Sequence, residues 1–286
     1  MTLLKGRTTE VRVDSEGPVV MIGEKINPTG HKKLVIALKE GAEDYIRELA
    51  KSQMQYGAHV LDVNVGAPGI NEESLLPRIV KLLAAEYDVP LCIDSGNPRA
   101  LAAGLEAAPG KPLVNSVNGE KEKLEAILPI VRDRGAAVIG LTMDNQGIPN
   151  DADSRLAIAE KIVNRAVRIG IPKEDVLIDT LVLTVGADQK AALVSLRTIE
   201  LVRERIGVNV NIGASNVSFG LPDRQTINRA FMAMAIRAGA SCVITDPAKM
   251  GATVLASDLL LGRDPYGKRY LVAVRKRQEL DRDSAC

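Results

Sequence analysis

The sequence predicts an α/β protein of one domain, folded as a (β/α)8 TIM barrel. Eight short apolar runs recur along the 286 residues, and each leads into a helical pattern. Alternation of this kind gives right-handed crossovers and a parallel sheet, and eight units without a long interruption favour a closed barrel over an open doubly wound sheet. The length and the 46% hydrophobic content are sufficient for one substantial core.

The predicted strands are almost continuously apolar, which is typical of a parallel sheet covered on both faces. They are residues 19–27, 59–65, 90–95, 112–118, 136–143, 176–182, 209–217 and 242–247. Amphipathic stretches between them predict helices, and three of these stretches end at a glycine. These three are residues 34–56, 120–134 and 153–169, followed by Gly57, Gly135 and Gly170.

We expect the barrel to occupy residues 19–265. Residues 1–18 are predicted to form a cap or a short hairpin, and residues 266–286 a C-terminal tail with a last helical turn and a frayed end. Residues 1–18 contain no signal-peptide apolar block, and no run reaches the roughly 18 apolar residues of a membrane span. A cytoplasmic protein without a membrane contact is the simplest interpretation.

The charges and cysteines exclude several other classes. The chain has 37 Lys and Arg against 36 Asp and Glu, a balance that does not indicate a nucleic-acid partner. Cys92 and Cys242 lie inside apolar runs and Cys286 is terminal, so neither a disulfide framework nor a metal cluster is indicated. We expect the two internal cysteines to be small buried hydrophobic residues, and we expect no metal site.

Polar side chains gather where the predicted strands finish. They are Glu24, Asn27, Asp62, Asn64, Asp94, Asn115, Asn118, Asp179, Asn216 and Asp246. In this fold the ligand site lies at the C-terminal ends of the strands, and buried carboxylates need partners, either one another or a ligand. Two residues also have a structural alternative: Asp94 as a cap of a helix over residues 97–107, and Asn216 as a partner of loop backbone.

Seven segments in order over about residues 20–262 resemble pterin-binding methyltransferases. They are GEKIN (23–27), GAHVLDVNVGAPG (57–69), LCIDSGN (91–97), VNSVNGE (114–120), IGLTMDNQGIPND (139–151), LIDTLV (177–182) and GASNVSFG (213–220). The chain most resembles the methyltetrahydrofolate:corrinoid protein methyltransferases of acetogens and of anaerobic O-demethylase systems. The resemblance implies a homodimeric barrel that moves a methyl group between N5 of tetrahydrofolate, with 5-methyltetrahydrofolate as the methylated form, and the cobalt of a corrinoid held by another protein.

The same resemblance implies roles for the strand-end residues. Asp94 and Asp179 would hold the pyrimidine ring and the N8 side of the pterin, because carboxylates accept paired hydrogen bonds from its N–H groups. Asn216 would lie beside N5 and assist there as charge develops, so Asn216 and Asp94 are the expected catalytic residues. The other expected pterin-binding residues are Glu24, Asn27, Asp62, Asn64, Asn115, Asn118 and Ser215.

Some features are absent or different. After the NVS triplet the acetogen enzymes have a polar amide, whereas this chain has Phe219, which packs either in the core or over the reactants. The sequence has no Asp-x-His-x-x-Gly segment to ligate cobalt, so the corrinoid is expected on a partner protein. Two alternatives remain: a dihydropteroate synthase, which should carry a basic Ser-Arg-Lys-like loop where this chain reads GASNVSFG, and a non-catalytic folate-binding subunit.

Overall fold

The computed structural model describes residues 1–283 and contains a closed barrel of eight parallel strands. Around the barrel the order is β10-β3-β4-β5-β6-β7-β8-β9. The strands are β3 (Val20–Ile26), β4 (Val60–Val63), β5 (Leu91–Asp94), β6 (Leu113–Asn118), β7 (Ala137–Leu141), β8 (Val176–Asp179), β9 (Val210–Gly213) and β10 (Cys242–Thr245). Each lies within one of the eight predicted apolar runs, so the predicted barrel is confirmed.

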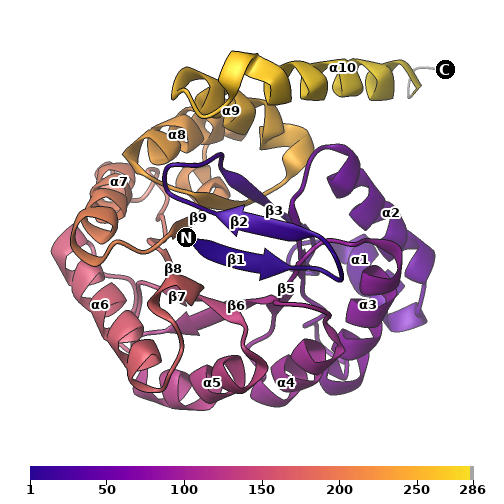
Figure 1. Ribbon diagram of the computed structural model, residues 1–286, viewed down its shortest axis with the longest axis horizontal. Coiled ribbons are helices and arrows are strands. Elements are labelled where there is room, and N and C mark those ends of the chain that lie inside the picture. The colour runs from indigo at the N-terminus through magenta and orange to yellow at the C-terminus, as the bar shows by residue number, and fades with distance from the viewer. Residues whose placement is uncertain (284–286) are drawn as a thin grey trace.

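Helices form a ring outside the strands (Figure 1). They are α1 (Lys32–Glu40), α2 (Glu43–Gln55), α3 (Glu72–Glu86), α4 (Pro98–Ala107), α5 (Lys121–Arg134), α6 (Ala152–Arg168), α7 (Ala191–Leu201), α8 (Arg224–Ala238), α9 (Pro247–Leu260) and α10 (Lys268–Asp283). Short turns add η1 (Lys173–Asp175), η2 (Val202–Ile206), η3 (Ala214–Ser218) and η4 (Pro265–Gly267). Among residues 1–283, no helix combines the length and the apolar character that a membrane crossing needs.

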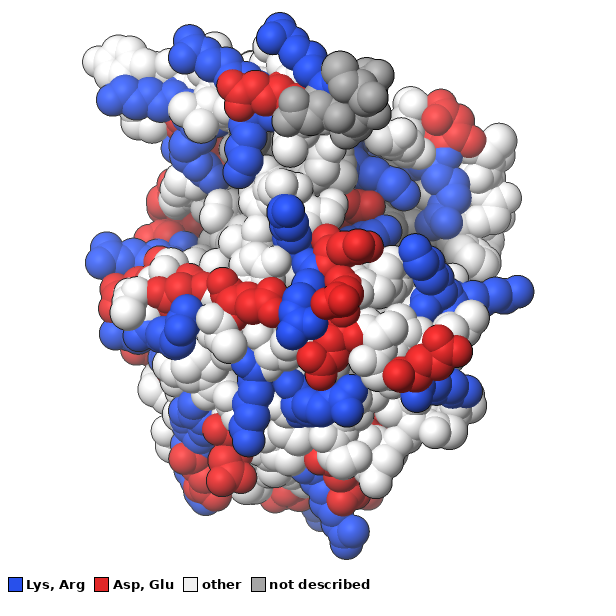
Figure 2. Space-filling view, turned by 90° about the vertical axis from the view of Figure 1, so that its right-hand side faces the viewer, with Lys and Arg blue, Asp and Glu red and all other residues white. Residues whose placement is uncertain are grey.

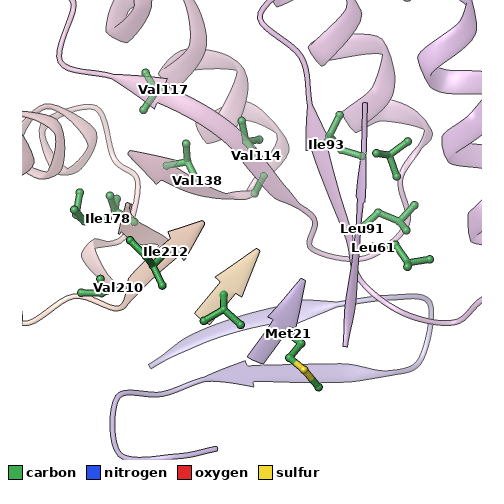
Figure 3. Packing of buried hydrophobic residues seen from close by; sticks show 14 of the residues in the cluster. Met21, Leu61, Leu91, Ile93, Val114, Val117, Val138, Ile178, Val210 and Ile212 are labelled. Carbon is green, nitrogen blue, oxygen red and sulfur yellow. The ribbon is translucent and has the colours of Figure 1, made fainter. Parts of the chain in front are cut away.

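The apolar core has two parts, separated by the barrel wall. The larger part fills the space between strands and helices, and it contains outward-facing strand residues such as Leu61, Ile93 and Val138 (Figure 3). The smaller part lies inside the barrel and includes Ile22 and the buried Cys92. Burial of both faces explains why the strands appear in the sequence as continuous apolar runs.

An N-terminal hairpin closes one end of the barrel, which agrees with the predicted cap. β1 (Thr2–Lys5) pairs antiparallel with β2 (Glu10–Val13), and the hairpin lies across the barrel end that faces the viewer in Figure 1. Leu4 and Val13 are fully buried against the inner core. The backbone of Lys5 is bridged to that of Lys111, beside the start of β6. Among the described residues, the barrel interior is thus covered at this end, and the opposite end, where the strands finish, is the one expected to hold a ligand.

Two helical predictions were wrong in extent. The stretch 34–56 is two helices, because Gly41 has a φ of 70° and ends α1 in the left-handed conformation. The C-terminal segment is not one turn but the 16-residue helix α10. Arg269 of α10 donates to the fully buried Asp258 over 3.0 Å, which ties this helix to α9. The predicted frayed end and Cys286 fall in residues 284–286, outside the described residues.

The outer surface carries both signs of charge. On the face shown in Figure 2, Lys and Arg side chains are interspersed with Asp and Glu side chains, with uncharged surface between them. Many of these groups pair locally, as Arg47 does with Glu43 and Asp44 on α2. Exposed pairs of this kind contribute little to stability.

Candidate functional site at the barrel mouth

Strand alternation sets which side chains point into the barrel. Successive strand residues face opposite sides, so Val60 and Cys92 in the inner core are followed two positions later by Asp62 and Asp94. The barrel interior therefore changes from apolar near the hairpin to polar near the strand ends. This change of polarity along the inward face of the strands builds the floor of the site.

A cavity of about 600 Å³ opens at this polar end. Seven of the predicted site residues line it: Glu24, Asn27, Asp62, Asp94, Asn115, Ser215 and Asn216. They come from β3 and the residue after it, β4, β5, β6 and η3, segments far apart in the sequence that barrel closure brings together. His31 also lines the cavity, where its Nε2 lies 3.1 Å from the hydroxyl of Tyr45, and the sequence reasoning did not select it.

Asp94 is held by two amides through a single oxygen. Its Oδ2 accepts hydrogen bonds from Nδ2 of Asn64 at 2.9 Å and from Nδ2 of Asn27 at 3.5 Å. None of residues 1–283 donates a hydrogen bond to Oδ1. Burial, opposed by the bond from Asn64, raises the pKa of Asp94 to about 6. The carboxyl group is thus oriented, with one acceptor oxygen left for a ligand.

The alternative role for Asp94, a helix cap, does not occur. The N-cap of α4 is Asn97, whose side chain accepts from the backbone N–H groups of Arg99 and Ala100. Asp94 is therefore a cavity residue, and the helix end is satisfied without it.

Asp62 lies deeper than Asp94 and is 2% exposed. Its Oδ1 accepts a hydrogen bond of 3.2 Å from Nδ2 of Asn115. Burial first, and then the nearby Asp94, raise the pKa of Asp62 well above its ordinary value. A buried carboxyl group whose charge is disfavoured by burial and by a neighbouring carboxyl group favours a ligand that brings hydrogen-bond donors or positive charge.

A close contact under β3 positions Glu24. Oε1 of the buried Gln53 accepts from the backbone N–H of Lys25 over 2.8 Å, at the irregularity where β3 shifts register against β4. A Cβ atom at Gly23 would lie 2.4 Å from this oxygen, so a larger residue there would displace the Gln53 side chain from this hydrogen bond. Burial and the charge of Asp246 raise the pKa of Glu24. Gln53 was not selected from the sequence.

Asp179 is buried at the end of β8 beside a second asparagine. Its Oδ2 accepts a hydrogen bond of 2.6 Å from Nδ2 of Asn211, and its Oδ1 accepts one of 2.8 Å from the N–H of Leu181. Burial raises the pKa of Asp179 to about 6. Oδ1 of Asn211 is buried and has no partner among the described residues. Asp179 and Asn211 do not belong to the cavity lining given above.

Asn211 was missed although it lies inside a predicted strand. The signal was alternation: Asn209 and Asn211 stand two residues apart in the run, so they share the inward face. Arg155, only 1% exposed, was also missed. It donates to the carbonyl groups of Thr180 and Leu181, at 2.9 and 2.8 Å, and so holds the chain that follows Asp179.

Asn216 stands on a short 3-10 turn that is fixed from several sides. Nη2 of Arg224 donates to the carbonyl of Ser215 at 2.7 Å, and the N–H of Val185 donates to that of Val217 at 2.9 Å. The side chain of Asn216 is exposed and forms no hydrogen bond with residues 1–283. It does not satisfy loop backbone, which was the structural alternative, and its amide is available to a ligand.

Three other residues lie away from the cavity lining. Asn118 donates to Oε1 of Glu120 at 2.8 Å at the rim. Phe219 is 67% exposed, which is inconsistent with core packing, the first of its two alternatives. His59 lies before β4, and its Nδ1 accepts from the N–H of Met21 at 3.0 Å. Burial lowers the pKa of His59 to about 4, which keeps the ring neutral and agrees with a structural role.

The sequence of residues 23–246, which carry the barrel and its polar mouth, matches the family described as pterin binding enzyme. The chain belongs to the pterin binding enzyme family. Methylcorrinoid:tetrahydrofolate methyltransferase of Eubacterium limosum is 33% identical to it over 90% of this chain and 97% of the relative. This long match makes the pterin binding enzyme described here a methyltransferase.

Other proteins match this chain at lower sequence identity. Methionine synthase of Mycobacterium tuberculosis is 31% identical over 96% of this chain, which spans only 24% of that protein. A dihydropteroate synthase of Yersinia pestis, solved with a sulfonamide drug complex, superposes with a TM-score of 0.69 at 17% identity over 91% of this chain and 98% of that one. At that identity the solved structure shows the same fold alone.

Proposed function

We propose that this enzyme moves a methyl group between N5 of tetrahydrofolate and the cobalt of a corrinoid held by a separate protein. The observation that carries the proposal is that two polar groups without hydrogen-bond partners among residues 1–283 line the same cavity. They are Oδ1 of Asp94 and the side-chain amide of Asn216. The similarity to the methyltransferase of Eubacterium limosum over nearly its whole length supports the same reaction.

The cavity suits the pyrimidine edge of a reduced pterin. This edge presents N–H donors, and a carboxylate with one free oxygen accepts them in a fixed direction. Asp94 is positioned for this by Asn64 and Asn27, and Asp62 and Asn115 add polar groups on the same floor. These polar groups are largely removed from water, so a ligand that forms hydrogen bonds with them offsets the cost of their burial.

Methyl transfer from N5 needs help at the nitrogen that is left behind. As the methyl group passes to the nucleophile, N5 keeps both electrons of the broken bond and must gain a proton or a strong hydrogen bond. The amide of Asn216 donates that hydrogen bond, which strengthens as negative charge develops. An amide does not give up a proton, so the proton arrives through water, and Phe219 takes no part in its delivery.

The reaction also requires partners. A cobalt(I) corrinoid needs no protein base, so the protein's task is to hold the folate, stabilise N5 and present an open mouth to the corrinoid protein. We expect a homodimer, as the resemblance implies, and light scattering of the purified protein measures this directly. The loop GASNVSFG after β9, without basic residues of its own, favours this reaction over dihydropteroate synthesis.

Calorimetry with 5-methyltetrahydrofolate tests the proposal. Wild type should bind, Asp94→Ala should abolish binding and Asn216→Ala should only weaken it. The exposed residues Asp133 and Asn164 provide matched controls, Asp133→Ala and Asn164→Ala, which should bind like wild type. If wild type gives no saturable heat, the pterin site is wrong. If it binds folate but exchanges no methyl group with any reduced corrinoid, the chain is a folate-binding subunit instead.

A further inference from the structure

A second hollow, of about 320 Å³, adjoins the cavity and has Glu24, Lys25 and Ser215 in common with it. We call it the side chamber; its remaining lining is Ala214, Arg224, Gln225, Asn228, Thr245, Asp246, Lys249 and Met250. These residues follow β9 and β10, the seventh and eighth strands of the barrel, where barrels of this fold frequently bind anionic groups. Arg224 helps to hold the turn that carries Asn216, but the reaction at N5 gives no ligand-binding role to the basic residues of the side chamber.

Arg224 is the best-positioned cation in the chamber. Its Nη2 donates to the carbonyl of Ser215 and its Nε donates to Oγ of Ser218 at 3.1 Å, while Nη1 forms no hydrogen bond with residues 1–283. Arg224 is also the first residue of α8, and the N-cap Asp223 provides no side-chain cap. A guanidinium group beside an uncapped helix N-terminus attracts a carboxylate from two directions.

The chamber keeps an excess of positive charge. Asp246 lies 3.5 Å from Nζ of Lys25 and 3.9 Å from Nζ of Lys249, and it also caps α9. The other carboxyl group, Glu24, is largely withdrawn from solvent. Three cations therefore face two carboxyl groups, and one of the three, Lys249, has a side chain that is 66% exposed and free to move toward a ligand.

The orientation of the bound pterin directs its substituent toward this chamber. Asp94 ends β5 and Asn216 follows β9, and these strands are four positions apart around the ring of eight, on opposite sides of the mouth. With the pyrimidine edge on Asp94 and N5 beside Asn216, the adjacent C6 atom also faces the β9 side. A p-aminobenzoyl-glutamate group attached at C6 would thus leave on the β9 side of the mouth, where the side chamber adjoins the cavity through Glu24, Lys25 and Ser215.

Resting on the proposed function, we propose that the side chamber binds the glutamate carboxylates of the folate tail through Arg224, Lys249 and Lys25. The chamber makes the enzyme selective for folates over pterins that lack the tail. Further γ-linked glutamates add carboxylates at the exposed end, near Lys249, so polyglutamylated folates should bind at least as tightly as the monoglutamate.

Calorimetry with two ligands tests this: 5-methyltetrahydrofolate, and a tetrahydropterin with methyl groups at N5 and C6 and no tail. Wild type should bind the folate about tenfold more tightly, because two charge-assisted contacts are added. Lys249→Glu should weaken folate binding about fivefold more than it weakens binding of the tail-less pterin. Lys123→Glu, an equal charge reversal on exposed α5, should change the ratio of the two affinities by less than twofold.

The outcomes separate the two proposals. Equal wild-type affinity for both ligands, or an equal loss on both in Lys249→Glu, overturns the tail site and leaves the pterin site intact. Failure of wild type to bind either ligand overturns the proposed function and the tail site together. A preference for folate that shrinks as salt is raised from 0.05 to about 0.5 M supports the charge-based contact.

Discussion

The side-chain amide of Asn64 donates a hydrogen bond of 2.9 Å to Oδ2 of Asp94, across the neighbouring ends of β4 and β5. The bond uses one carboxylate oxygen of this cavity-lining residue and leaves the other without a partner among residues 1–283. Asn64 is itself fixed, because its Oδ1 accepts from the N–H of Gly66 at 2.7 Å. The ligand-binding oxygen is therefore positioned before any ligand arrives.

Binding of 5-methyltetrahydrofolate should weaken as pH falls through about 6, the raised pKa of Asp94. The N–H donors of the pterin bind the ionised carboxylate, and below this pH a growing fraction of Asp94 is protonated. Calorimetry at intervals from pH 5 to 7.5 measures the effect. Asp94→Asn, which does not ionise, should bind more weakly at pH 7.5 and show a flatter pH profile. An equally steep profile in the variant would assign the titration to another group.

Replacement of Asn216 should damage transfer more than binding. In Asn216→Ala the hydrogen bond to N5 is lost, and because it strengthens only as charge develops, the rate of methyl transfer should fall by about 100-fold. The dissociation constant for 5-methyltetrahydrofolate should rise less than about fivefold. Single-turnover transfer to reduced cobalamin and calorimetry provide the two numbers. Equal losses in rate and affinity would show that Asn216 only binds the substrate.

The free energy of unfolding should depend on pH through Asp179. Its pKa is about 6 in the folded protein and about 3.8 when unfolded, so the folded state binds more protons between these values. The stability that this carboxyl group contributes is fully present below pH 3.8 and is lost as pH rises through 6, by about 3 kcal/mol in all. Urea unfolding at pH 4, 5, 6 and 7 should show wild type losing stability relative to Asp179→Asn. A constant difference would refute the assignment.

The buried side chain of Arg155 should contribute strongly to the free energy of unfolding. Arg155→Met leaves the carbonyl groups of Pro149, Thr180 and Leu181 without their donor, which should cost about 2 to 4 kcal/mol of unfolding free energy. Arg168→Met, on the exposed side of the same helix, should change it by less than about 0.5 kcal/mol. Thermal or urea unfolding of both variants measures the contrast, and similar losses would contradict the role assigned to the buried guanidinium group.

The barrel was predictable because both faces of its strands are covered. Each strand then appears as an apolar run, and polar residues stand out where the run meets the mouth, as Asp62 and Asp94 do. Helix boundaries were harder to predict. Gly41 ends a helix within a stretch whose apolar period continues beyond it. The helix α10 is held by the contact of Arg269 with Asp258, which no local sequence pattern indicates.

Within the site, the sequence indicated residues but not their partners. Pairing of Asn64 with Asp94, or of Asn115 with Asp62, depends on strand register, which a run of apolar residues does not specify. Asn211 and Gln53 were missed for another reason. Neither ends a strand, and each acts on a neighbour, Asn211 on Asp179 and Gln53 on the backbone beside Glu24.

The N-terminal hairpin across the floor of the barrel has a kinetic consequence under the proposed function. Because Leu4 and Val13 cover that end of the barrel in the part of the chain that the structure describes, the pterin and the corrinoid are expected to approach through the same mouth. The smaller molecule must enter first, because a docked protein would block its path. Turnover should therefore follow a compulsory order, in which the corrinoid protein associates last and dissociates before the folate leaves.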